Sequence, residues 1–168
     1  RSRGVLCRER VRSGAARQAG DQALDELSSG KYDGANYVIA DAESAWAVHG
    51  GDELNAQELE EGLSIISNSD VNDPRDERVQ LAYRLLTLQT LDSPVKFLAV
   101  ASKVFARAPS PPGRPTMIAR GKDWGTVSST LIALGKKPRD AIYQFASDAP
   151  DRVKYEDYSP MLRDILSR

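Results

Sequence analysis

The apolar and polar positions between residues 35 and 50 predict a β-hairpin. Tyr37, Val38 and Ile39 form a short β-prone run. In the second run, Ala45, Ala47 and His49 alternate with Ser44, Trp46 and Val48. A polar stretch that begins at Asp41 separates the two runs. Two short β-prone runs joined by a polar turn are typical of a hairpin.

A third strand is expected after this hairpin. The acidic stretch 52–61 predicts a surface connection that includes a short edge strand, and the apolar residues of 63–67 predict a further strand. That strand would stop at the polar cluster 67–70. The end of a strand is a common place for functional side chains, because the strand fixes where they point.

Apolar residues at helical spacing predict helices on both sides of these strands. The first covers Leu6–Leu27, with a potential break near Ser13-Gly14, and a helix pair follows at 75–88 and 94–106. Ser93 and Pro94 provide the N-cap and the first helical residue of the last of these helices. The expected buried stripes are Ala16, Ala19, Ala23, Leu24 and Leu27 in the first helix, and Val79, Ala82, Tyr83 and Leu86 in the second.

The C-terminal part of the chain predicts a second hairpin. Residues 108–115 contain four prolines and predict a loop, for which an ordinary solvent loop is favoured over a lid. The apolar second half of 124–134 and the run 141–146 predict paired strands, and 155–168 ends in a short helix. The resulting order of helices and hairpins predicts a single α+β domain over residues 1–168, with a mostly antiparallel sheet.

Composition restricts the function more than it defines it. The chain has 168 residues, of which 40% are hydrophobic and 28% are charged, which is enough for a domain with a real core. A net charge of −1 offers no electrostatic case for a nucleic-acid partner or an anionic membrane surface, and no apolar run reaches the length of a membrane span. The single cysteine, Cys7, excludes an internal disulfide, suits a cytoplasmic location and is expected to be a packing residue. No metal site or cofactor is expected, because one histidine and one cysteine make a zinc site unfavourable.

Two polar segments are the candidates for chemistry. In Ser67-Asn68-Ser69-Asp70, the amide of Asn68 would donate to a developing oxyanion, or the segment would be an Asx turn. In residues 125–130, small hydroxyl side chains and a glycine would let a substrate approach the backbone, or would be a polar entrance to a strand. His49 is the only imidazole and is expected to be structural, and the chain has neither a phosphate-binding glycine loop nor a Gly-x-Ser-x-Gly elbow.

These segments also carry a resemblance to a known family. Residues 35–41, the segment Gly62–Arg75 and the late Trp-Gly-Thr-Val-Ser-Ser-Thr at 124–130 resemble, in the right order, motifs of the NRDE family. The opening Arg1–Leu6 is similar to the Ser-Arg-Gly segment of that family, which includes the transport-and-Golgi-organisation proteins. The family in turn is similar to N-terminal-nucleophile hydrolases, so the resemblance implies an αββα sandwich with two stacked, mostly antiparallel sheets.

The resemblance also implies roles for particular residues. Asn68 would hold the oxyanion or substrate, and Ser128 would lie at the catalytic site. Thr126, Ser129 and Asn36 would line the binding site for a small-molecule substrate. The implied reaction is hydrolysis or acyl transfer at a linear amide bond.

The chain departs from the family at its start. The Cys-initiated first strand and the Asn-Arg-Asp-Glu signature are not found, and Cys7 is internal, so no nucleophile is expected within this chain. We therefore expect the C-terminal two thirds of the family domain, with a separate N-terminal segment that supplies the cysteine. The alternatives are a non-catalytic binding or trafficking factor on the same fold, with a homodimer left open, and an unrelated α+β domain in which Asn68 and Ser128 lie far apart.

Overall fold

The computed structural model describes residues 2–11, 13–51, 53–108 and 114–168. Within these ranges the chain forms five α-helices and two antiparallel sheets of three strands each. The backbone divides into two compact units, Arg1–Val79 and Gln80–Arg168, and each is described by itself. The expected α+β class with antiparallel strands is confirmed.

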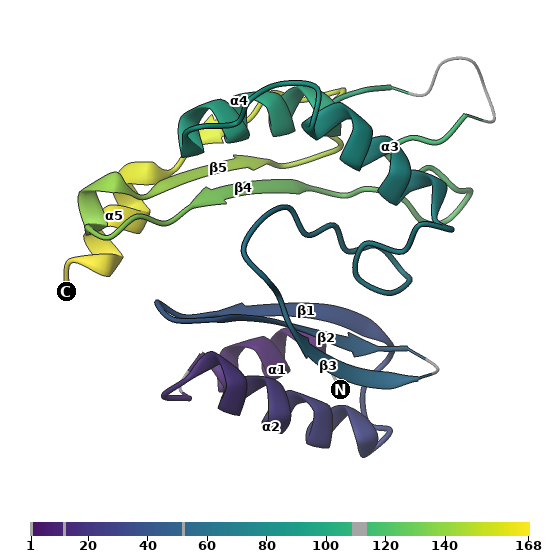
Figure 1. Ribbon diagram of the computed structural model, residues 1–168, viewed down its shortest axis with the longest axis vertical. Helices are drawn as coiled ribbons and strands as arrows, with labels where there is room; N and C mark the ends of the chain where they lie inside the picture. Colours follow the sequence, from purple (N-terminus) through teal and green to yellow (C-terminus); the bar gives the residue numbers. More distant parts are fainter. Residues whose placement is uncertain (1, 12, 52, 109–113) are drawn as a thin grey trace. The chain divides into compact units, whose positions relative to one another are not determined.

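The first unit packs two helices against a three-stranded sheet. Helices α1 (Arg3–Arg10) and α2 (Ala16–Ser28) precede strands β1 (Ala35–Ala40), β2 (Ala45–Gly50) and β3 (Leu54–Glu58). The strand order is β1-β2-β3, so β2 is the central strand. Helix α2 lies along one face of this sheet (Figure 1). The predicted hairpin and the predicted short edge strand are both confirmed.

Small side chains let α2 approach the sheet closely. A Cβ on Gly20 would lie 3.7 Å from side-chain atoms of Trp46 and Val48, which is ordinary van der Waals contact. The predicted stripe of α2 is buried except for Leu24, which is partly buried against the core. Burying this stripe against apolar strand residues stabilises the unit, because the contact area leaves water. The buried residues of this core are Leu6, Ala23, Leu27, Tyr32, Tyr37 and Val48.

The first predicted helix is interrupted at the expected place, but the burial expected for Cys7 is wrong. Helix α1 ends at Arg10 and α2 begins at Ala16, which brackets Ser13 and Gly14. Leu6 is fully buried in the core, whereas Cys7 is exposed. Neighbouring residues of a helix point about 100° apart, so a short helix that buries Leu6 turns Cys7 toward solvent.

The strand predicted at 63–67 does not form. Ile65 instead bonds to Asn72, since its backbone N–H donates to Asn72 Oδ1 and its carbonyl accepts from the Asn72 N–H, both at 2.8 Å. Asn72 adopts a left-handed conformation with φ 56°, which turns the chain back on itself. Leu63, Ile65 and Ile66 are half-buried, so the apolar pattern indicated burial correctly but not the secondary structure.

The second unit contains the other sheet. Helix α3 (Glu77–Leu86) crosses the boundary between the units, and α4 (Pro94–Phe105) follows it. Strands β4 (Ser129–Ala133), β5 (Ile142–Ala146) and β6 (Glu156–Asp157) pair in that order, with the 3-10 helix η1 (Pro138–Asp140) between β4 and β5 and α5 (Ser159–Leu166) at the end. Helix α4 lies along β4 (Figure 1).

Most predictions for the second unit are confirmed. The Ser93 hydroxyl caps α4 by accepting from the Lys96 N–H, and the hairpin at β4 and β5 forms. The two-residue strand β6 is missed because two polar residues carry no periodic signal. Tyr83 was expected in the buried stripe of α3, but it is 54% exposed while Val79, Ala82 and Leu86 are buried. Residues 109–113 of the predicted proline-rich loop lie outside the described residues.

Candidate functional site

The face of the first sheet opposite α2 carries a row of polar side chains. Val48 is fully buried and contacts the α2 side, so the alternation of a strand turns His49 to the opposite face. The register pairs Asn36 with His49 and His49 with Asn55, which places three polar side chains side by side across the sheet. Gln57 lies in the next row of the same face, opposite Ala47.

The segment after the sheet folds over this polar row. The side-chain amide of Asn36 donates to the backbone carbonyl of Ser67. Between the sheet and this segment lies a cavity of about 10 Å³, which is about the space of one water molecule. Its lining residues are Asn36, Ala47, Val48, His49, Asn55, Gln57, Ile66, Ser69, Asp70 and Val71.

His49 is held tightly at the end of β2. A Cβ on Gly51 would lie 2.5 Å from His49 Nε2, so a larger residue at position 51 would displace the imidazole. Its Nδ1 is buried and has no hydrogen-bond partner among the described residues. A buried nitrogen without a hydrogen-bond partner costs free energy. This arrangement therefore favours a polar group from outside the protein beside Nδ1.

Asp76 anchors the covering segment to the start of α3. Its Oδ2 accepts from the Ser67 hydroxyl at 2.5 Å and from the Ser69 hydroxyl at 3.4 Å. Its Oδ1 accepts from the N–H groups of Arg78 and Val79, which is the geometry of an N-cap. The Ser67 hydrogen bond is the main reason that the pKa of Asp76 lies below its usual value. Asp76 is therefore the N-cap of the helix that was predicted over 75–88.

Asp73 and Arg75 form a second anchor in the same loop. The Asp73 carboxylate is buried and accepts from Arg75 Nε and a terminal guanidinium nitrogen, each at 3.0 Å. These hydrogen bonds are the largest cause of a lowered pKa for Asp73. The planar guanidinium suits this two-point contact, and the loop is therefore pinned on both sides of Pro74.

Asn68 projects from this pinned segment into solvent. It is exposed, and its side chain makes no hydrogen bond within the described residues. Its neighbours Ser67 and Ser69 bond to each other at 2.9 Å. The structure therefore presents a free amide donor on a braced loop, close to Asn36, which was expected at the same site.

The hydroxyl-rich segment belongs to the second unit. The Thr126 hydroxyl accepts from the Ala119 N–H at 3.0 Å, and the Thr126 N–H donates to the Ala119 carbonyl at 2.9 Å. The Ser129 hydroxyl lies 2.7 Å from the Tyr155 hydroxyl, and Ser128 is exposed. Burial raises the pKa of Tyr155, and the hydrogen bond with Ser129 opposes this rise.

The structure thus brings together part of the predicted site. Asn36 and the 67–70 segment meet in the first unit, while Thr126, Ser128 and Ser129 share one segment of the second. Sequence analysis missed Asn55, Gln57 and Asp76. Asn55 and Gln57 stand at alternate positions of β3, which places them on the same face of the strand. That pattern identifies them as site residues only when the register of β3 with β2 is known.

Among the described residues, no group of three or more His, Cys, Asp or Glu side chains is arranged to hold a metal ion. No helix in the same ranges is long and apolar enough to cross a membrane. No protein-family model, no curated protein and no solved structure matches this chain.

Proposed function

We propose that this chain forms the substrate-binding part of a cytoplasmic, NRDE-like protein of the N-terminal-nucleophile hydrolase type, which hydrolyses or transfers an acyl group at a linear amide bond. The single observation that carries the proposal is the braced loop that presents Asn68. Hydrogen bonds from Asn36 and to Asp76 hold Ser67, the residue before Asn68. These contacts hold the backbone next to Asn68, and its unpaired side-chain amide is a donor of the kind that stabilises a developing oxyanion.

The two-layer organisation of each unit supports the proposed αββα sandwich. In the first unit α2 covers one face of its sheet, and in the second α4 contacts β4. On β4, Leu131 is buried while Ile132 is 51% exposed, and Leu134, just after the strand, is 66% exposed. An apolar face left open on a sheet favours a second layer against it.

The proposed reaction needs a nucleophile from outside this chain. The hydroxyls of Ser67 and Ser69 are bonded to Asp76, and that carboxylate also caps α3. Ser129 is bonded to Tyr155. We propose that a separate N-terminal segment supplies a cysteine, whose own α-amine acts as the base.

The natural full-length protein tests this proposal. Intact-mass analysis with thiol labelling would identify an N-terminal cysteine, and a panel of N-acyl amino acids would be assayed for amide cleavage. Replacement of that cysteine should abolish turnover. Asn68→Ala should lower kcat by roughly 10²-fold or more with a small change in KM, as for loss of one oxyanion donor. Gln18→Ala, which removes an exposed amide on α2, is the matched control and should leave kcat unchanged.

A natural protein whose translation starts near Arg1, with no cysteine supplied by another chain, would contradict the catalytic proposal. So would amide cleavage that is unaffected by Asn68→Ala.

A non-catalytic binding factor is the second candidate. It is favoured by the engaged serine hydroxyls and by the buried Nδ1 of His49, which bonds to no serine within the described residues. This candidate predicts saturable binding of a small-molecule ligand without turnover. Amide cleavage that depends on an N-terminal cysteine would exclude it.

A further inference from the structure

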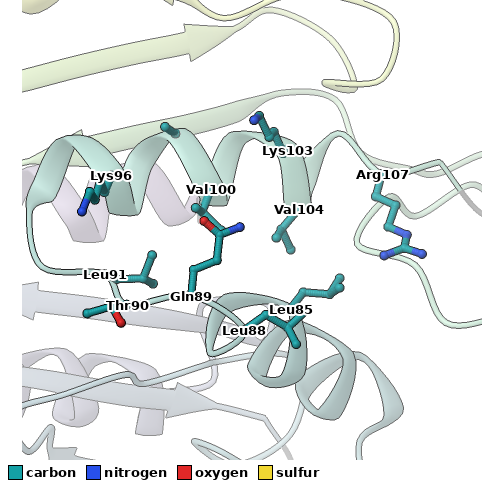
Figure 2. A pocket seen from close by; sticks show the side chains of 11 residues that line it. Leu85, Leu88, Gln89, Thr90, Leu91, Lys96, Val100, Lys103, Val104 and Arg107 are labelled. Carbon is teal, nitrogen blue, oxygen red and sulfur yellow. The ribbon is translucent and has the colours of Figure 1, made fainter.

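Helices α3 and α4 and their connection enclose a groove within the second unit. The groove has a volume of about 400 Å³, which falls within the usual range for small-molecule sites. Leu85 comes from the end of α3, Leu88 and Leu91 come from the connection, and Val100 and Val104 come from α4 (Figure 2). The groove is distinct from the polar row on the first sheet and from the hydroxyl segment before β4.

Apolar residues and the amide side chain of Gln89 form the middle of the groove. Figure 2 shows the Gln89 side chain between the helices beside Val100, with Val104 pointing from α4 toward Leu85. Leu88 is 70% exposed, although it lies within this apolar strip. An exposed leucine in a lined groove differs from an isolated surface leucine, because a ligand in the groove would remove it from water together with its neighbours.

Cationic side chains lie along the α4 side of the same groove. Lys96 and Lys103 lie on α4 and Arg107 lies two residues after its end, and all three line the groove. Lys96 is already paired with Asp92 at 2.9 Å. Lys103 and Arg107 form no ion pair within the described residues, so the end of the groove near Arg107 carries positive charge that is not neutralised by a neighbour.

We propose that this groove binds a single-chain amphiphile with an aliphatic tail and a carboxylate head. The head lies against Arg107, and the tail runs along Val104, Leu88 and Leu91. The guanidinium of Arg107 donates to both carboxylate oxygens, which is the geometry that arginine favours. The tail gains free energy because it leaves water together with the leucines of the groove.

The size of the groove favours this occupant over a protein partner or a membrane. A stable protein interface buries about 800 Å² on each partner, whereas this groove holds only a small molecule. The charges lie at one end and along one side, with the apolar residues between the helices. This arrangement matches a ligand with one charged end and one long apolar end.

Isothermal titration of the whole chain with dodecanoate, below its micelle concentration, tests the proposal. We expect saturable one-to-one binding, and roughly tenfold weaker binding of dodecanol, which has the same tail without the charge. Arg107→Gln should weaken dodecanoate binding by about tenfold and leave dodecanol binding unchanged, since a charge-assisted hydrogen bond contributes about one order of magnitude. Leu88→Asp should weaken both ligands by at least tenfold.

Matched controls separate the groove from the rest of the unit. Leu134→Asp places the same charge at a leucine of similar exposure outside the groove, and Arg139→Gln removes an exposed guanidinium elsewhere. Both should leave dodecanoate binding unchanged. Thermal unfolding of every variant checks that the unit remains folded, and Leu88 is exposed enough that its replacement should not alter the melting temperature.

Three outcomes would overturn the proposal. The first is no saturable dodecanoate binding, and the second is equal affinity for dodecanoate and dodecanol. The third is dodecanoate binding that survives Leu88→Asp.

Flotation with phosphatidylserine vesicles and size-exclusion chromatography complete the test. Vesicle binding or dimer formation that is lost with Leu88→Asp, without dodecanoate binding, would identify the groove as a membrane or self-association surface instead.

Discussion

The hydroxyl of Ser67 donates a 2.5 Å hydrogen bond to Asp76 Oδ2, and the other oxygen of the same carboxylate caps helix α3. One side chain therefore connects the loop that presents Asn68 to the start of a helix. Asp76→Ala would leave the N–H groups of Arg78 and Val79 without their partner. We expect this variant to lower the free energy of unfolding by about 1 kcal/mol, as for loss of an N-cap.

Urea denaturation measures this change, and Asp25→Asn, an exposed position on α2, is the control with no expected effect. Hydrogen exchange at residues 67–70 provides the second readout. Faster exchange there would follow from loss of the Ser67 contact. An Asp76→Ala variant with unchanged stability and unchanged exchange would show that the carboxylate braces neither element.

The acid sensitivity of the fold follows from the same carboxylate. Its folded pKa is lowered, mainly by Ser67, while the unfolded residue titrates near pH 4. Above that pH the carboxylate is ionised in both states, and its hydrogen bonds contribute fully. As the pH falls through the folded pKa, the unfolded state binds the proton more readily, so this contribution to stability is lost.

Asp76→Asn should therefore make stability less dependent on pH below about pH 4, because asparagine still accepts hydrogen bonds but does not titrate. Urea unfolding of both proteins between pH 2.5 and pH 7, as rough limits, measures the difference. Parallel curves for the wild type and Asp76→Asn would contradict the assignment to Asp76. Asp41 and Asp73 also have lowered pKa values, so part of the acid sensitivity should remain in the variant.

Asp41 connects the first hairpin to helix α2. One carboxylate oxygen accepts from the Ala16 N–H at 2.6 Å, and the other accepts from the N–H groups of Glu43 and Ser44 at 2.8 Å each. Ala15 has no side chain that caps α2, so Asp41 performs this role from a distant turn. These backbone hydrogen bonds lower the pKa of Asp41.

Asp41→Ala should lower the melting temperature more than Asp41→Asn, because asparagine keeps one acceptor oxygen. Glu43→Gln is the control in the same turn and should have little effect. Melting temperatures from circular dichroism rank the three variants. If Asp41→Ala and Glu43→Gln were equal, the cap would make no measurable contribution.

Leu6 and Cys7 provide a matched pair on helix α1. Leu6 is fully buried and Cys7 is exposed, although they are adjacent. Leu6→Ala should lower the free energy of unfolding by about 3 kcal/mol, as for other buried leucines, and Cys7→Ala should change it by about 0.5 kcal/mol or less. In the native protein Cys7 should react with a thiol reagent without unfolding. Slow labelling that tracks global unfolding would show that Cys7 is buried after all.

Local patterns predicted much of each unit. The first hairpin, the interruption between α1 and α2, the Ser93 cap and the β4–β5 hairpin all follow from interactions between residues close in the chain. Ile65 and Cys7 show where such patterns fail. A half-buried apolar run is compatible with a strand or an irregular loop, and the choice depended on Asn72, whose left-handed turn supplied the hydrogen bonds that a strand partner would have supplied.

By itself, the sequence determined the helical and strand periods, the turn and cap positions and the candidate polar segments. Each of these depends on neighbours within a few residues. Tertiary structure alone decided that Asn36 meets Ser67, that Asp41 caps a helix 25 residues away, and that three cations border an apolar groove. These contacts depend on strand register and helix packing, which join residues distant in the chain through many weak interactions at once. A pattern of a few neighbouring residues does not contain the information on these long-range contacts.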